Sequence, residues 1–381
     1  MADKKKILLF ADWYEPGYKA GGPIRSCVNF ARYMQGEYEV YVFTADRDLG
    51  SPAEYENIPK NEWMVGKGGD RVFYCSPGNL RWSTIYRQMT TLQPDFIYLN
   101  SMFSGKFTIV PLLIHRIYRL KSRIILSPRG MLRSSAVRFK SGKKKAFLKS
   151  FRWLGFHRRI EFLAADDTEA GDIRRYFGRE TRVTKIPNFP ASLPLTRAVT
   201  GKSSGELKMI YIGRIHPIKN LDYLLLVLKE VRANIRLTVV GSVEDESFWL
   251  DCRRIIEDLP ANIRVTHAGE IPNDRMPPLI AEHHIFALPT KGENFGHAIF
   301  EALALGKPVL ISDQTPWRGL QSAGAGWDLS LDRPEEFRLA IEEAAAYDGE
   351  EYEGLCRTTW KYIENYIARL DLKDEYKKLF S

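Results

Sequence analysis

The chain has 381 residues, of which 44% are hydrophobic and 27% charged, with a net charge of +9. This composition is typical of a soluble globular protein and excludes a largely disordered one, and the length fits two α/β domains. No hydrophobic run approaches the roughly 20 residues that cross a bilayer, so we expect no membrane-spanning segment.

The positive charge is concentrated in one region. Residues 96–160 contain 16 lysines or arginines and no acid, whereas the rest of the chain has 40 basic and 47 acidic residues. Such an asymmetry indicates an anionic partner for this region.

The four cysteines are scattered and predict neither a zinc site nor a disulfide framework. The hydrophobic run near the N-terminus is too short for a signal peptide and fits a first buried strand. We therefore expect a protein of the reducing cytoplasm.

The first half alternates β-branched or aromatic runs with helical patterns, which predicts a parallel, doubly wound sheet. The strands are expected at 7–11, 39–44, 71–75, 95–100, 123–127, 161–165 and 181–186. Helical patterns between them include residues 23–34, 82–91 and 168–177.

A stretch rich in Pro, Ser, Thr and Gly then interrupts the pattern, and a second alternation follows. Its strands are expected at 207–212, 235–240, 263–267, 285–288 and 308–311, and the run from Tyr352 is helical without further strand signals. The predicted fold class is α/β with two Rossmann-like doubly wound domains. The first spans residues 1–190, 191–206 form a linker, the second spans 207–365, and 366–381 form a helix that packs back on the first domain.

Ligands of open parallel sheets bind beyond the carboxyl ends of the strands, so chemistry is expected in the loops there. "MIYIGRIHPIKN" follows such a strand. Gly213 permits a tight turn, and Arg214 and Lys219 bring two cations to one loop before a helix, which suits a diphosphate. Two solvated surface cations are the alternative.

"TKGENFGHAIFEALALGKPV" follows another strand. Gly296 lets the backbone approach a ligand, and the amides of Asn294, Phe295 and Gly296 are expected to point outward at a helix start. Glu293 on the loop and Glu301 on the helix suit vicinal hydroxyls. The alternatives are an ordinary helix N-terminal acid for Glu293 and a buried salt bridge for Glu301.

Together with "EPGYKAGGPIRSCVNFARYM" and "VTKIPN", these ordered motifs resemble those of the retaining glycosyltransferases of family 4, group 1, which have the GT-B fold. The resemblance covers most of the chain. It implies two Rossmann-like domains that face a central cleft, the first binding the acceptor and the second the nucleotide sugar.

Carried over to this sequence, the resemblance implies that Arg214 and Lys219 hold the donor diphosphate. Glu301 would bind the ribose and Glu293 the transferred sugar. Arg214, Lys219, Glu293 and Arg129 form the expected catalytic set.

The remaining expected donor contacts are backbone contacts, made by Asn294, Phe295 and Gly296 and, in the first domain, by Gly21 and Gly22. Gly213 belongs to the same donor-binding set. No cofactor and no catalytic metal are implied, and the donor is expected to be a UDP- or GDP-sugar.

Two positions depart from the family pattern. Phe189 replaces a glycine that many relatives carry after "IPN". Many relatives also have a His-Asp pair after a first-domain strand, where this chain has "SPRGMLRSS". Arg129 is the nearest candidate to face the acceptor or the developing charge, and a structural arginine is the alternative. Lys185 and Asn188 are weaker carry-overs near the domain junction.

The implied mechanism retains the anomeric configuration. An acceptor hydroxyl attacks from the side of the leaving diphosphate, whose oxygen takes the proton, so no protein nucleophile is required. "DRD" at Asp46 to Asp48 matches a metal-binding DxD only superficially, and we favour a structural role. The seven histidines show no metal-ligand spacing.

The segment "KSGKKKAFLKSFRWLGFHRR" carries its cations and apolar residues at helical spacing. The cations are Lys143, Lys144, Lys145, Lys149 and Arg152. Such a helix suits an anionic membrane surface that presents a lipid-linked acceptor, or it packs its apolar stripe (Phe147, Leu148, Phe151, Leu154) into the first domain. No nucleic-acid module accompanies the charge.

The sequence thus predicts a metal-independent glycosyltransferase at the inner face of the cell membrane. It would transfer a sugar to a glycan or lipid-linked glycan in polysaccharide biosynthesis. A nucleotide-sugar epimerase of the same architecture and a non-catalytic anion- or membrane-binding protein are the alternatives.

Overall fold

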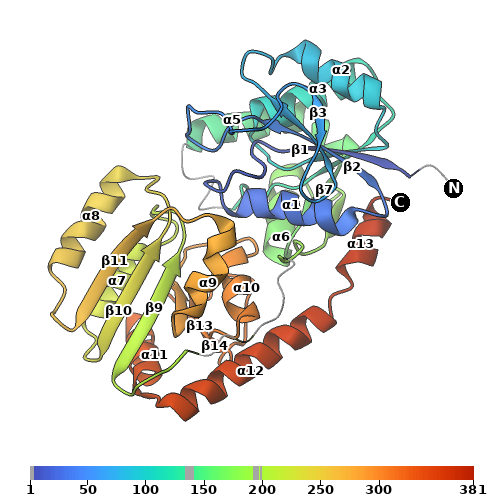
Figure 1. The fold of residues 1–381 in the computed structure, drawn as a ribbon. Helices are drawn as coiled ribbons and strands as arrows, with labels where there is room; N and C mark the ends of the chain where they lie inside the picture. Colours follow the sequence, from blue (N-terminus) through green and yellow to red (C-terminus); the bar gives the residue numbers. More distant parts are fainter. Residues whose placement is uncertain (1–3, 134–140, 192–196, 198–199) are drawn as a thin grey trace. The chain divides into compact units, whose positions relative to one another are not determined.

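The structure, a computed structural model, describes residues 4–133, 141–191, 197 and 200–381. The chain forms two compact units. Unit 1 consists of Met1–Pro190 and Asp371–Ser381, and unit 2 of Ala191–Leu370. Each is built on its own sheet with helices packed against it (Figure 1).

Unit 1 contains an eight-stranded sheet in the order β3-β4-β2-β1-β5-β6-β7-β8. All neighbouring strands pair in parallel except β3 and β4. The strands are β1 Lys6–Phe10, β2 Glu39–Ala45, β3 Trp63–Val65, β4 Arg71–Cys75, β5 Phe96–Leu99, β6 Arg123–Leu126, β7 Ile160–Ala164 and β8 Val183–Lys185. The central strand β1 is buried from Ile7 to Phe10 because both of its faces are covered, which explains its continuous hydrophobic sequence.

Helices connect these strands and supply the rest of the core. They are α1 Gly22–Met34, α2 Trp82–Leu92, a π-helical turn η1 Gly105–Ile109 that continues into α3 Val110–Ile117, α5 Ser141–Trp153, a 3-10 turn η2 Phe156–Arg159, α6 Asp167–Phe177 and α13 Leu372–Leu379. The core is rich in aromatic side chains, such as the stacked rings of Phe43 and Phe73.

The C-terminal helix α13 belongs to unit 1 although the chain reaches it from unit 2. Tyr376 of α13 stacks on Phe189 with ring centres 4.3 Å apart, and Tyr33 stacks on Phe189 at 4.6 Å. Phe380 packs on Phe30 at 5.4 Å. Phe189, the residue that departs from the family's glycine, therefore lies in the aromatic cluster that holds α13.

Unit 2 contains a six-stranded, all-parallel sheet in the order β11-β10-β9-β12-β13-β14. The strands are β9 Glu206–Ile212, β10 Asn234–Val240, β11 Ile263–Gly269, β12 Ile285–Leu288, β13 Val309–Ser312 and β14 Gly326–Leu329. The helices are α7 Leu221–Lys229, α8 Glu246–Glu257, a 3-10 turn η3 Asn273–Arg275, α9 Met276–Ala281, α10 His297–Ala304, α11 Pro334–Ala346 and α12 Gly349–Ala368.

The predicted α/β class is confirmed, and each predicted strand is present within two residues of its expected ends. Strands β3 and β14 were not predicted, because each has only three or four residues and β14 begins with glycine. Of the expected linker, residues 192–196 and 198–199 lie outside the described residues. Lys202, in its described part, donates from Nζ to Ala345 O at 2.8 Å and Tyr347 O at 2.9 Å and is thereby fixed to unit 2.

Candidate functional site

The expected donor residues of unit 2 lie at the point where its strand order reverses. From β9 the chain builds β10 and β11 on one side and then returns to build β12, β13 and β14 on the other. The loops after β9 and β12 therefore lie at the carboxyl edge beside this reversal, which is where ligands of such sheets bind. Arg214 and Lys219 lie in the first loop and Glu293 to Gly296 in the second.

The loop after β9 is fixed by the neighbouring loop after β10. Gly213 N donates to Val240 O at 3.0 Å, and Ile215 N to Ser242 O at 2.8 Å. Gly241 is the glycine that this geometry requires, because a Cβ there would lie 2.0 Å from Gly213 O, and its φ is +146°. The sequence pattern pointed to Gly213 for the tight turn instead, but an added Cβ at Gly213 would meet only ordinary contacts.

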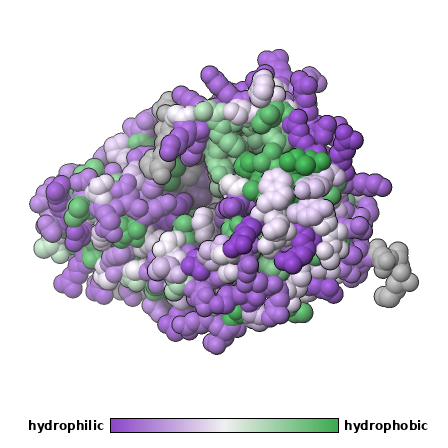
Figure 2. Space-filling view, turned by 90° about the horizontal axis from the view of Figure 1, so that it is seen from above, coloured by the Kyte–Doolittle hydropathy of each residue, from purple (hydrophilic) through white to green (hydrophobic). Residues whose placement is uncertain are grey.

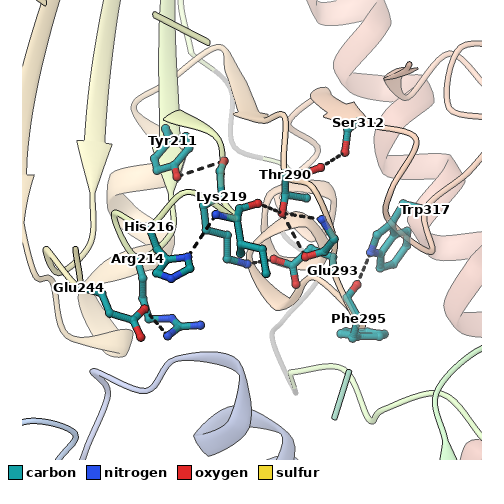
Figure 3. Close-up of polar contacts among 12 residues, drawn as sticks. Tyr211, Arg214, His216, Lys219, Glu244, Thr290, Glu293, Phe295, Ser312 and Trp317 are labelled. Atoms are coloured by element: carbon teal, nitrogen blue, oxygen red, sulfur yellow. Dashed lines mark hydrogen bonds and ion pairs between the residues drawn. The ribbon is translucent and has the colours of Figure 1, made fainter. Parts of the chain in front are cut away.

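The loops after β9 and β12 are joined directly (Figure 3). Ile218 O accepts from Thr290 Oγ1 at 3.0 Å and from Lys291 N at 2.8 Å. Glu293 N donates to Gln314 O at 3.1 Å, which ties in the loop after β13. Three strand-end loops thus form one hydrogen-bonded layer.

Each expected cation in this layer faces an acid. The Lys219 ammonium pairs with the Glu293 carboxylate, and the Arg214 guanidinium pairs with the Glu244 carboxylate (Figure 3). Burial lowers the pKa of Lys219 to about 7, and the adjacent charge of Arg214 acts in the same direction. Glu244 was not expected at the site, although its position after β10 could have suggested it.

Gly296 starts α10 in the left-handed region at φ +77°, where its missing Cβ would lie 2.8 Å from Ile299 Cδ1. The preceding carbonyl of Phe295 accepts from Trp317 Nε1 at 2.6 Å. This contact fixes the backbone that leads into α10, so the amides at the helix start are held in place.

Asn294 precedes these residues, and its side chain carries a separate signal. Both its Oδ1 and its Nδ2 are buried without a hydrogen-bond partner among the described residues. Buried polar atoms are normally paired, so an unpaired amide in a candidate binding loop indicates a ligand that would complete it. The sequence motif had suggested only backbone contacts from Asn294.

Glu301 lies on α10, about one helical turn after the helix begins, and is 1% exposed. Its neighbours Phe300 and Ala302 are buried as well. Its assignment to the ribose stays a prediction.

In unit 1, the strand order reverses between β1 and β5, and the loop after β1 contains Gly21 and Gly22. Gly21 has φ +62° and begins α1, and no atom lies within 4 Å of where its Cβ would be. Asp48 Oδ2 accepts from Tyr18 N at 2.7 Å and from Lys19 N at 3.0 Å. The "DRD" stretch thus shapes this loop, in line with its expected structural role.

Arg129 follows β6 and uses three guanidinium nitrogens within unit 1. Nε donates to Asn100 Oδ1 at 2.6 Å, Nη2 donates to Tyr98 OH at 2.7 Å, and Nη1 donates to Asn188 Oδ1. These contacts give Arg129 and Asn188 a structural role at the carboxyl edge of the sheet, and a catalytic role for Arg129 stays a prediction. Lys185 Nζ forms an ion pair with Asp167 Oδ1 at 3.0 Å.

No group of three or more His, Cys, Asp or Glu side chains is placed to hold a metal ion within the described part of the chain. His283 and His284 serve the fold. His284 Nε2 donates to Gly201 O at 3.0 Å and its Nδ1 accepts from Lys208 N at 3.0 Å, and burial lowers its pKa to about 4.

The basic helix α5 packs its apolar stripe inward. Leu148 and Phe151 are buried in the core of unit 1, and Phe147 packs against that core. This is the alternative that the sequence left open for the stripe. Leu154, just beyond the helix, is 39% exposed, and the cations Lys143, Lys145, Lys149 and Arg152 are exposed. Lys144 lies over the ring of Phe103, with its Nζ 5.3 Å from the ring centre.

Comparison with known proteins supports the interpretation of unit 2. Residues 194–344 match the family model of the glycosyl transferases group 1. The matched residues lie within unit 2. D-inositol 3-phosphate glycosyltransferase of Segniliparus rotundus is 27% identical over 39% of this chain and 36% of that protein. The chain also spans only 30% and 37% of the next two curated relatives.

Solved structures resemble the whole chain. Sucrose-phosphate synthase of Thermosynechococcus elongatus has a TM-score of 0.70 at 16% identity and covers 99% of both chains. HepE of Anabaena, solved in complex with UDP and glucose, has a TM-score of 0.65 at 16% identity and covers 96% of this chain and 100% of that one. These likenesses show the GT-B fold, and the residues that match the group 1 model lie in the second of its two Rossmann-like domains.

None of the helices formed by the described residues combines the length and hydrophobicity needed to cross a membrane.

Proposed function

We propose that this protein transfers a sugar from a nucleotide sugar to a hydroxyl of a glycan or lipid-linked glycan. The observation that carries the proposal is the placement of two cations at the strand reversal of unit 2, where Lys219 pairs with Glu293 and Arg214 pairs with Glu244. Both cations are at least partly buried, and each lies beside an acid. A diphosphate with an attached sugar uses both the cations and the acid.

Different residues bind different parts of the donor. Arg214 and Lys219 neutralise the diphosphate, and the amides at the start of α10 add oriented dipoles. Glu293 and the unpaired Asn294 amide face the sugar hydroxyls, and Glu301 accepts from the ribose.

We propose the following reaction for this arrangement. As the bond between the sugar and the phosphate breaks, negative charge grows on the leaving diphosphate, and Arg214 and Lys219 stabilise it. The acceptor hydroxyl attacks from the same face, and its proton passes to the leaving phosphate oxygen. The configuration is thereby retained, and neither a covalent enzyme intermediate nor a metal is needed in this scheme.

A Lys219→Gln variant tests the proposal. It removes the charge that faces the diphosphate, and we expect its affinity for UDP or GDP, whichever binds the parent, to fall roughly tenfold to a hundredfold. Lys229→Gln is the matched control, because Lys229 is a half-exposed lysine that pairs at 3.8 Å with Asp258, away from these loops. Titration calorimetry measures both affinities.

Unchanged nucleotide affinity in Lys219→Gln would contradict the diphosphate assignment. The products formed from the sugar donor that binds best identify the reaction. A sugar joined to an acceptor hydroxyl with retained configuration supports transfer, whereas an isomerised nucleotide sugar formed without acceptor would replace it with epimerisation.

We further infer that unit 1 meets an anionic membrane surface through the end of α5. Trp153 is 85% exposed, and Ile117 and Tyr118 at the end of α3 are also exposed. Arg116 donates to Leu154 O, which brings the ends of α3 and α5 together. Exposed aromatic and apolar residues among cations favour an interface with anionic lipid. Hydrophobic side chains also gather on the face of unit 1 seen in Figure 2, framed by hydrophilic ones.

Vesicles of phosphatidylcholine with phosphatidylglycerol test this placement. Replacing Lys143, Lys144 and Lys145 by glutamine removes three charges, each worth about 1 kcal/mol near such a surface, so binding falls roughly a hundredfold at low salt. Trp153→Ala weakens binding at all salt concentrations, whereas Leu339→Ala, which alters an exposed leucine of unit 2, does not. Equal vesicle binding by the triple variant and the parent would rule the placement out.

A further inference from the structure

A second candidate site lies in unit 1, away from the donor loops. A pocket of about 380 Å³ opens between the ends of α5 and α6 and the segment that enters β8. Four arginines line it: Arg152, Arg158, Arg179 and Arg182. The one acid in the lining is Glu180, which is exposed.

The arginines are not neutralised by neighbouring acids. Arg158, Arg179 and Arg182 are exposed, and none of them forms an ion pair within the described residues. Arg152 donates from Nη1 to Tyr176 O at 3.3 Å, a contact that leaves its charge uncompensated. Four guanidinium groups against one carboxylate make the pocket strongly attractive to anions.

Two buried polar atoms in the same lining lack partners. His157 Nδ1 and Thr181 Oγ1 have no hydrogen-bond partner among the described residues, and both residues are only 8% exposed. His157 stacks on Phe177 with ring centres 5.9 Å apart, which fixes the plane of its imidazole. Native proteins rarely leave such atoms unpaired, so they indicate a ligand with hydrogen-bonding oxygens.

The imidazole of His157 suits an anion even when it carries no charge. Burial lowers the pKa of His157, and the neighbouring charges of Arg158 and Arg152 lower it further. A neutral imidazole protonated on Nδ1 can donate to an anionic oxygen, and the hydroxyl of Thr181 can donate as well.

The topology separates this pocket from the candidate donor and acceptor loops. His157 precedes β7, and Thr181 and Arg182 precede β8, so these residues lie at the amino ends of the parallel strands. Gly21 and Arg129 follow β1 and β6 and lie at the opposite, carboxyl edge of the same sheet. The pocket is therefore not part of the loops assigned to catalysis.

We propose that this pocket binds a phosphate group carried by a small polar molecule or by a lipid headgroup. A phosphate accepts several hydrogen bonds in different directions, which matches guanidinium forks combined with one hydroxyl and one imidazole N–H. The volume also accommodates a small group attached to the phosphate. Four cations outweigh both Glu180 and the carbonyl end of α6 beside them. The proposal does not rest on the sugar-transfer reaction.

Two probes distinguish the sources of the phosphate. Glycerol 3-phosphate, followed by titration calorimetry, represents a soluble ligand. A lipid headgroup is represented by phosphatidylcholine vesicles that contain phosphatidic acid, compared by flotation with vesicles of equal charge that contain phosphatidylglycerol instead. Binding to glycerol 3-phosphate identifies a soluble ligand, and binding only to vesicles that contain phosphatidic acid identifies a headgroup.

Three variants of the full-length chain test the site. Arg158→Gln with Arg182→Gln removes two charges from the pocket and is expected to lower binding at least tenfold. Thr181→Val removes one hydroxyl without changing charge or size and is expected to lower binding about fivefold to tenfold. The charge-matched control, Arg87→Gln with Arg174→Gln, alters two exposed arginines outside the pocket and is expected to bind as the parent does.

The same variants distinguish a phosphate site from a purely structural role of these side chains. Thr181→Val should keep or raise the melting temperature, since it removes an unpaired buried hydroxyl. UDP affinity should stay unchanged in all three variants, whatever the outcome for sugar transfer. No binding to either probe, an equal loss in the control, or no effect of Thr181→Val would overturn the proposed phosphate site.

Discussion

Two cations at the candidate donor site are balanced by acids in different ways. Lys219 and Glu293 are both largely buried and come from loops that follow adjacent strands. Arg214 and Glu244 are more exposed. A diphosphate that reached these loops would compete with both acids for the cations, so the acids keep the charge compensated without a ligand.

Lys307 is a different case, because no acidic side chain of the described residues forms an ion pair with it. It is 1% exposed, and its Nζ donates to Thr200 Oγ1 at 2.6 Å. Burial lowers its pKa from 10.5 to about 8. Between these two values the unfolded chain binds more protons than the folded one, so the free energy of unfolding should rise with pH across this window. The cost of burying the charge is fully present below pH 8.

Lys307→Met should remove that pH dependence. We expect the variant to be more stable than the parent at pH 7, by about 2 kcal/mol, and the difference to shrink towards pH 10.5. Thr200 Oγ1 still donates to Ala281 O at 2.5 Å, so the substitution leaves its proton paired. Urea unfolding at pH 7 and pH 9.5 measures the effect, with Lys229→Met as an exposed control. A variant less stable than the parent at pH 7 would contradict this interpretation.

At the scale of elements, the sequence predicted the buried strands well because both sheets bury them on two faces. Their continuous β-branched and aromatic runs admit few other interpretations. The short edge strands β3 and β14 lack such runs. Gly241 was missed because its necessity arises from the close approach of two loops, which becomes visible only once β9 and β10 are paired.

The basic helix α5 shows where a periodic pattern is ambiguous. Its spacing of cations and apolar residues fits both a membrane surface and a core-packed helix. The structure places Leu148 and Phe151 in the core, which favours the core-packed interpretation for the apolar stripe. The evidence for a membrane-facing role is therefore the exposed Trp153. A periodic pattern cannot predict such a role, because it rests on a single aromatic residue.

At the scale of the whole molecule, both units place their candidate loops by one rule. In each sheet the expected binding residues follow strands on either side of a reversal in strand order. From the alternation of strands and helices, the sequence predicted only that binding residues lie in loops at the carboxyl ends of the strands, and the strand order became known from the structure. The phosphate pocket escaped prediction because its arginines, histidine and threonine come from three segments that become neighbours only at the amino edge of a folded sheet.

Unit 1 is discontinuous in sequence, and this organisation leads to a prediction. Ending the chain at Leu370 removes the buried side chains of Leu372, Tyr376, Leu379 and Phe380 and uncovers Phe189. The loss is on the order of 5 kcal/mol in the free energy of unfolding of unit 1. Unit 2 keeps all its strands, so its affinity for nucleotide should remain. Urea unfolding followed by aromatic circular dichroism measures the stability of unit 1, and UDP titration in parallel measures the nucleotide affinity. The control is Lys373→Gln, which removes only an exposed contact with Glu37 and should lower the free energy of unfolding little. If the shortened chain unfolded at the same urea concentration as the parent, α13 would not stabilise unit 1.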